Sequence, residues 1–319
     1  MQLQNTMRLK NGKMASEKRE SIISHILNNK LLYLLILPGL IYLIIFNYIP
    51  MYGVIISFQD FDLIKGIWGS KWVGFQHFHT LFTSPEFLDV FINSVSISLL
   101  RIFWGFPAPI ILALLLNEVT NMSFKRITQS VVYLPHFVSW VVISGIVFEF
   151  LSPSGGVINE VIKFFGGQSI AFLQEPRYFR SIIVISDIWK EIGWGSIIYL
   201  AAMVSVPSEL YEAGIIDGAS RIRRIWHITL PGISSTIIVI LILRMGSILK
   251  NGFEQIFLLY NPMVYNVADV FETYTYRVGL ISGKFALSSA VGLFQSIVGL
   301  VLIVFVNKLA KKYGDGGLW

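Results

Sequence analysis

The stretch VPSELYEAGIIDGASRIRRIWHITLPGI, Val206–Ile233, joins two apolar segments and is more patterned than a simple connection requires. Pro207 is expected to end the helix before it, and Ser208 is a residue type that caps the next one. Glu209 and Glu212 then fall in the first turns, where the helix dipole favours negative charge. The stretch therefore predicts a short helix that begins at Ser208.

Small residues follow along this predicted helix and would let the backbone of a partner approach closely; they are Ala213, Gly214, Gly218 and Ala219. Gly218 is expected to break the helix or to pack tightly. Leu230 and Pro231 mark the entry to the next apolar segment. The pattern is typical of a helix that docks on another protein.

The composition of the whole chain points to a membrane. Of 319 residues, 54% are hydrophobic and only 14% charged, which is too apolar for one water-soluble core. The net charge of +6 then reflects cytoplasmic loops that face anionic lipid headgroups, and nucleic acid is not an expected partner. The absence of cysteine excludes disulfides and thiolate metal sites.

Six apolar stretches are long enough to cross a bilayer, whose hydrocarbon core of about 30 Å requires about 20 helical residues. They run over Leu31–Ile49, Phe91–Leu116, Ser130–Phe150, Ile182–Val206, Ile233–Leu249 and Ala286–Val306. The sequence therefore predicts an all-α membrane protein with six transmembrane helices. The patterned loop lies between the fourth and the fifth.

Lysine and arginine set the expected orientation, because cytoplasmic loops carry an excess of them. They concentrate in the N-terminal tail, in the loop with Lys125 and Arg126, in the patterned loop and after the last span. We expect both termini in the cytoplasm. Residues 1–30 form one tail, 31–306 the transmembrane domain with its loop 207–231, and 307–319 a second tail. The first span is interpreted as retained, not as a signal peptide.

The order of residues in the patterned loop resembles the "EAA" loop of the permease subunits of ABC importers. Glu212 and Ala213 are followed by Gly218, and Ile228, Leu230 and Pro231 close the motif. Gly214 departs from the alanine that is most frequent in the family, which lowers helix propensity by about 1 kcal/mol. The wider pattern is similar to the sugar-importing branch, of the maltose and glycerol-phosphate type.

Two further stretches extend the resemblance over most of the chain. VGFQHFHTLFTSPEFLDVFINS, Val73–Ser94, is similar to the segment that precedes the second core span of sugar permeases. Residues 252–319, which contain GFEQIFLLYNPMVYNVADVFETYTYRVGL and end in GLW, resemble the subgroup that imports oligosaccharides from complex polysaccharides such as pectin or alginate.

This resemblance implies a type I importer permease in the bacterial inner membrane. It would form a heterodimer with a second permease, and the two would enclose the path for an oligosaccharide. The other partners would be two ATPase subunits and a lipid-anchored extracellular binding protein. ATP and Mg²⁺ would bind to the ATPase, so this chain would hold no cofactor and would not be an enzyme. The residues expected to couple to the ATPase are Glu212, Ala213, Gly214, Asp217, Gly218, Ala219, Ile228, Leu230 and Pro231. Arg221, Arg223 and Arg224 would contact lipid headgroups or acidic residues of the ATPase.

Charged residues inside the predicted spans are costly and need a reason; they are Arg101, Asp187, Lys190, Glu191 and Arg244. One reason is an ion pair on the surface of one helix, since Asp187 and Lys190 are three residues apart. The alternative is a sugar path, which needs aromatic faces and hydrogen-bonding groups. Candidates for that path are Trp140, Glu149, Trp189, Glu191, Trp194, Tyr199, Arg101, Glu254 and Gln255, with interfacial tryptophan as the ordinary alternative for Trp140.

Two other motifs do not indicate a binding site. His77 and His79 are two residues apart but lack an acidic cluster, so no metal site is expected. GLISGK, 279–284, has one residue too few for a phosphate-binding loop and no Ser or Thr after its lysine. The sequence favours neither of two other classes of function. An ion-coupled secondary sugar transporter would need no docking helix, and an intramembrane enzyme would need a catalytic set that the sequence does not offer.

Overall fold

The computed structural model describes residues 29–313, and the regular structure in this range is almost entirely helical. The expected N-terminal tail lies mostly outside the described residues, as does the end of the expected C-terminal tail. The chain divides after Ile55 into two units, which are described separately.

The first unit contains one apolar helix built from α3 (Lys30–Leu43), a π-helical turn (Ile44–Tyr48) and α4 (Ile49–Met51). Together with the 3₁₀ helix Tyr52–Phe58 it is long and apolar enough to cross a membrane. Its large apolar side chains are exposed within the described chain. They are therefore suited to lipid, as predicted for the first span.

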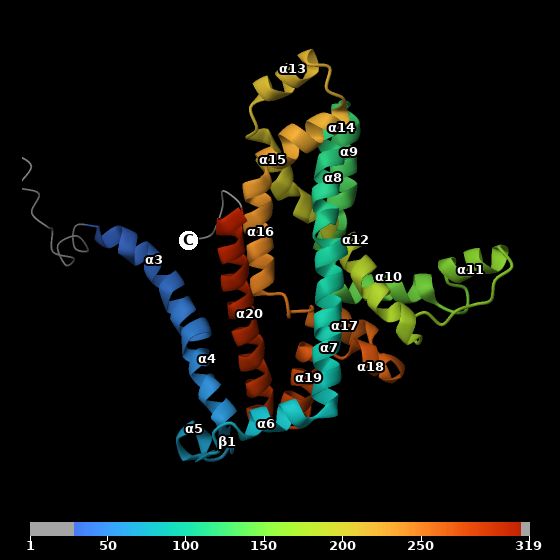
Figure 1. The fold of residues 1–319 in the computed structure, drawn as a ribbon. Helices are drawn as coiled ribbons and strands as arrows, with labels where there is room; N and C mark the ends of the chain where they lie inside the picture. Colours follow the sequence, from blue (N-terminus) through green and yellow to red (C-terminus); the bar gives the residue numbers. More distant parts are fainter. Residues whose placement is uncertain (1–28, 314–319) are drawn as a thin grey trace, which may run out of the picture. The chain divides into compact units, whose positions relative to one another are not determined.

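Long helices frame the second unit (Figure 1). The helix α7 (Pro85–Leu100) continues through a π-helical segment (Arg101–Gly105) into α8 (Pro107–Glu118). It passes the criteria for a membrane span, as does α20 (Phe285–Tyr313) over most of its length. The predicted second and sixth spans lie within these helices. Because α20 runs beyond Val306, the helix extends into the expected C-terminal tail.

The predicted third span, Ser130–Phe150, is wrong as a single straight helix. The structure has α9 (Met122–Tyr133), a 3₁₀ turn (Leu134–Phe137) and α10 (Trp140–Leu151), and the chain bends by 104° at the break. Pro135 lacks the N–H that would continue the α-helical hydrogen bonds, and the chain leaves the helical conformation at Val138 and Ser139, where ψ is 135° and 153°. Ser139 then caps α10 by accepting a hydrogen bond from the N–H of Val142, at 3.4 Å.

The predicted fourth and fifth spans differ from simple apolar helices. The fourth corresponds to α12 (Pro176–Val204), which begins and ends earlier than predicted and carries Asp187, Lys190 and Glu191 near its middle. The fifth is α16 (Ser234–Gly246), which is shorter than predicted. The preceding helical run Arg221–Gly232 meets α16 at an angle of 61°.

Among the residues that the structure describes, three helices are long and apolar enough to cross a membrane, or up to five if each bent pair is one span. The helix α12 is long enough but is not one of them. The membrane-spanning, mainly helical architecture is therefore as predicted, and the number of six spans stays a prediction.

Shorter elements connect the long helices. Two strands, β1 (Gln59–Asp60) and β2 (Lys71–Trp72), form an antiparallel pair that the all-α prediction did not include. The other elements are α5 (Gly66–Gly69), α6 (Gln76–Thr83), α11 (Val157–Phe164), α13 (Ser208–Ile216), α14 (Arg221–Arg224), a π-helix (Ile225–Thr229), α15 (Leu230–Gly232), α17 (Phe253–Leu259), a 3₁₀ turn (Pro262–Val264), α18 (Tyr265–Ala268), α19 (Phe271–Thr275) and a further π-helix (Tyr276–Ile281).

The helix α8 packs against α12, and α12 also packs against α9. Gly193 of α12 lies where a Cβ atom would overlap the backbone carbonyl of Val132. A glycine is therefore needed at this crossing, which fixes α12 against the end of α9. These contacts place the middle of α12 beside both α8 and the bend after α9.

Candidate functional site

The patterned loop forms the predicted short helix, α13, at one end of the second unit (Figure 1). The prediction that Ser208 caps this helix is wrong, because Pro207 occupies the cap position and no side chain bonds the first amides. Gly218 ends it with a φ of +70°, a conformation that favours glycine. The N–H of Ala219 donates to the carbonyl of Gly214 at 2.8 Å, which closes the turn.

The chain returns from this turn and packs against α13. The hydroxyl groups of Tyr211 and Thr229 are 3.0 Å apart and hydrogen-bonded. A Cβ atom at Gly214 would lie 3.1 Å from Cδ1 of Ile228, so the Ile228 side chain would have to shift by a few tenths of an ångström to accept it. Glycine at this position therefore lets α13 contact the returning π-helix without this shift.

The base of this loop is joined to the long helices by an apolar cluster. Val206 and Ile233, at the two ends of the loop, are buried with Tyr199 and Met203 of α12 and Ile110 of α8. Packed interiors transmit displacement because they hold few voids. The cluster thus connects the two ends of the loop to α8, α12 and the start of α16.

The residues predicted to couple to an ATPase occupy two kinds of position. Exposed members are Glu212, Ala213, Asp217, Gly218 and Pro231. Half-buried members are Gly214 and Ala219, on α13 and its closing turn, and Ile228 and Leu230, on the returning chain. The predicted set omitted Ile215 and Ile216, of which Ile216 is 85% exposed. The helix thus presents apolar side chains beside two carboxylates, which is the composition of a docking surface.

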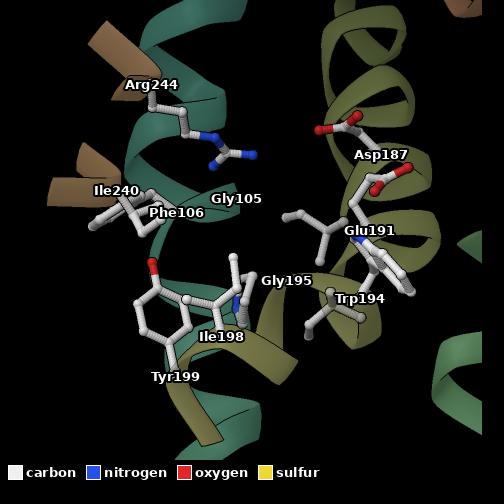
Figure 2. A pocket seen from close by; sticks show the side chains of 13 residues that line it. Gly105, Phe106, Asp187, Glu191, Trp194, Gly195, Ile198, Tyr199, Ile240 and Arg244 are labelled. Carbon is white, nitrogen blue, oxygen red and sulfur yellow. The ribbon is translucent and has the colours of Figure 1, made fainter. Parts of the chain in front are cut away.

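A cavity of about 180 Å³ lies between the start of α8, the middle of α12 and α16 (Figure 2). Three predicted path residues, Glu191, Trp194 and Tyr199, come together in it. Its other lining residues are Gly105, Phe106, Pro109, Asp187, Ile188, Ile192, Gly195, Ile198, Ile240 and Arg244. The cavity therefore combines aromatic faces with charged groups.

Four other predicted path residues lie elsewhere. Trp189 lines an apolar hollow with residues of α10 and α12, and Glu149 lines a separate cavity of about 740 Å³. The ring of Trp140 lies 5.6 Å from Nζ of Lys190, and Glu254 is exposed on α17. The structure therefore does not bring these four to the cavity of Figure 2.

The last two candidates, Arg101 and Gln255, bond to each other. Gln255 is buried, and its Nε2 donates to the carbonyl of Ile183 at 2.7 Å and to Oγ of Ser186 at 2.9 Å. Its Oε1 accepts a hydrogen bond from Nη2 of Arg101. Nε of Arg101 lies 3.7 Å from Oδ2 of Asp187. The expected ion pair of Asp187 with Lys190 on one helix is therefore wrong, since Asp187 pairs across helices.

Lys190 stabilises the bend between α9 and α10. Its Nζ donates to the carbonyls of Pro135, His136 and Val138 at 3.3, 2.7 and 2.6 Å. Carbonyls at a helix end lack partners within the helix, and lipid cannot supply them. The buried ammonium group meets this need from α12.

His136 is a site residue that the sequence did not reveal. Its Nδ1 is 2.8 Å from Oε2 of Glu191, and its ring stacks on Trp194 with centroids 4.4 Å apart. Pro135 signals the break beside it, but no local spacing links His136 to residues more than fifty positions away. Only the packing of α12 on the bend brings them together.

Comparison with known proteins identifies this architecture. Residues 105–314 match the family described as binding-protein-dependent transport system inner membrane component. The chain belongs to this family. It is 48% identical to the polygalacturonan/rhamnogalacturonan transport system permease protein YteP of Bacillus subtilis, over 95% of this chain and 94% of that protein. It is 50% identical to the protein LplB of the same organism, over 91% and 92% of the two chains.

A solved structure agrees in fold. The chain superposes on a chain of the bacterial alginate ABC transporter in complex with alginate pentasaccharide-bound periplasmic protein, with a TM-score of 0.87 and 42% identity over 93% of this chain and 99% of that one. The predicted resemblance to ABC importer permeases is therefore confirmed. Members of this family are transport subunits, and separate ATPase subunits hydrolyse ATP.

Proposed function

We propose that this permease subunit forms, with a second and different permease, the path for oligosaccharides released from acidic polysaccharides. The names of the relatives, which include polygalacturonan and alginate transporters, support this substrate class. The observation that carries the proposal is the cavity between α8, α12 and α16. Its rings, Phe106, Trp194 and Tyr199, suit the C–H faces of sugars, and its charged groups suit polar substituents.

Coupling to ATP hydrolysis is assigned to α13. Its exposed apolar side chains and its carboxylates would dock on an ATPase subunit, and the buried cluster at the base of the loop would carry the motion to α8 and α12. With this assignment we expect the loop and both termini in the cytoplasm of a bacterial cell. A binding protein would deliver the oligosaccharide on the opposite side, as the complexed alginate transporter suggests.

Cross-linking tests this arrangement directly, because the chain has no cysteine and a single one can be introduced. In the complete transporter, Asp217→Cys in the turn after α13 is expected to be captured on an ATPase subunit by a short bifunctional reagent. Glu160→Cys on the exposed face of α11 is the matched control and should capture none. The proposal fails if Asp217→Cys captures no ATPase, or if it reacts with a membrane-impermeant reagent added outside intact cells.

A further inference from the structure

Arg244 is a charged residue whose role the comparisons do not assign. It lies on α16 and points into the cavity, on the side opposite Asp187 and Glu191 of α12 (Figure 2). Within the described chain its guanidinium group makes no hydrogen bond and no ion pair. A cation in an apolar segment is costly unless something compensates it, so this group calls for a ligand.

A second cavity adjoins the first, and its charged lining residues indicate the charge of a ligand that would bind there. It has about 130 Å³ and shares Asp187 and Arg244 with the cavity of Figure 2. Its lining residues are Ser98, Arg101, Ile102, Asp187, Arg244, Ser247, Ile248 and Lys250. Three of these residues are cationic and one is anionic, so the lining of the second cavity has a net positive charge.

The single carboxylate of the second cavity is already engaged. Asp187 lies 3.7 Å from Nε of Arg101, whose Nη2 is held by the buried Gln255. This arrangement fixes Arg101 and balances its charge. Arg244 and Lys250 have no counterion within 4 Å in the described chain. The cations without such a counterion are therefore Lys250 and Arg244, and of these two only Arg244 lines both cavities.

We propose that Arg244, supported by Arg101 and Lys250, forms a subsite for the carboxylate of an acidic sugar as it passes through the permease. A guanidinium group binds a carboxylate through two parallel N–H···O bonds, which a neutral hydroxyl cannot match. The sugar ring would then lie against Trp194 and Tyr199 in the adjoining cavity. This inference rests on the proposed function and adds a residue that selects acidic over neutral substrates.

The size of the cavities agrees with one sugar unit and not with a whole oligosaccharide. Pockets that enclose drug-sized ligands have about 300–1,000 Å³, whereas the two cavities have about 180 and 130 Å³. The second permease of the transporter would supply the rest of the path. Arg244 therefore acts on one carboxylate at a time.

The test uses the complete transporter in proteoliposomes, with its binding protein saturated by trigalacturonate or by the methyl ester of trigalacturonate. Arg244→Gln is expected to lower the uptake of trigalacturonate about 10- to 100-fold, as for the loss of charge-assisted hydrogen bonds. Uptake of the methyl ester should be unchanged. Arg244→Lys keeps the charge and should restore part of the trigalacturonate uptake.

Arg177→Gln is the matched control, because Arg177 is exposed at the start of α12 and lines neither cavity. It should leave both rates at the wild-type level. The inference is overturned if Arg244→Gln transports trigalacturonate at the wild-type rate, or if it loses both probes equally. It is also overturned if the variant fails to assemble with the second permease, since Arg244 would then be an interface residue. If the wild type transports neither probe, the proposed substrate class fails as well.

Discussion

Replacement of Lys190 by methionine tests the physical basis of the bend between α9 and α10. Methionine has a similar length but no donor, and Lys190 is only 7% exposed. The substitution therefore removes three hydrogen bonds to the carbonyls of residues 135, 136 and 138 without opening a large cavity.

The magnitude follows from the number and kind of these bonds. A hydrogen bond from a charged donor contributes about 1.5–3 kcal/mol, and an unpaired buried acceptor costs about 1–3 kcal/mol. The methionine variant gains something in return, because burial of the ammonium group itself costs several kcal/mol. We expect the free energy of unfolding to fall by about 3 kcal/mol, near the lower limit for breaking a buried charged interaction.

Unfolding of the purified transporter in SDS, followed by tryptophan fluorescence, measures this change. Lys163→Met on α11 is the control, since Lys163 is exposed and pairs with Glu160 of the same helix. That variant should differ from the wild type by less than about 0.5 kcal/mol. If Lys190→Met unfolds at the wild-type SDS concentration, the bend does not depend on the ammonium group, and our explanation of the break is refuted.

Three further outcomes are expected. Gly218→Val forces a φ of +70° on a β-branched residue, at a cost of about 1–2 kcal/mol. The variant should insert into the membrane normally, but its ATP hydrolysis should no longer be coupled to uptake. Normal uptake with normal stimulated ATPase activity would contradict this. Gly193→Ala should lower the amount of folded protein in the membrane, because the added Cβ atom overlaps the backbone of α9. The control Gly292→Ala should leave this amount unchanged, because its Cβ atom meets nothing within 4 Å. Equal amounts of the two variants would count against the close crossing of α9 and α12. Tyr211→Phe should destabilise the loop by about 1 kcal/mol through the lost bond to Thr229, and a double-mutant cycle with Thr229→Val that shows no coupling would refute the contact.

Features that depend on neighbours in sequence were predictable. The apolar stretches at Leu31–Ile49, Phe91–Leu116 and Ala286–Val306 match long helices, since a bilayer core requires unbroken helical runs. The short helix after Pro207 and its end at Gly218 also followed from local rules, because only glycine adopts a positive φ without strain. The family resemblance rested on the same local pattern.

Interactions between distant residues were decided by the tertiary structure alone. Arg101 meets Gln255 across 154 positions, and Lys190 reaches the carbonyl of Pro135 across 55. Nothing in the spacing of the sequence specifies these partners. The charges inside the spans could be recognised as exceptional because lipid penalises them. Which of them is satisfied by the fold and which, like Arg244, is left for a ligand depends on how α8, α12 and α16 pack.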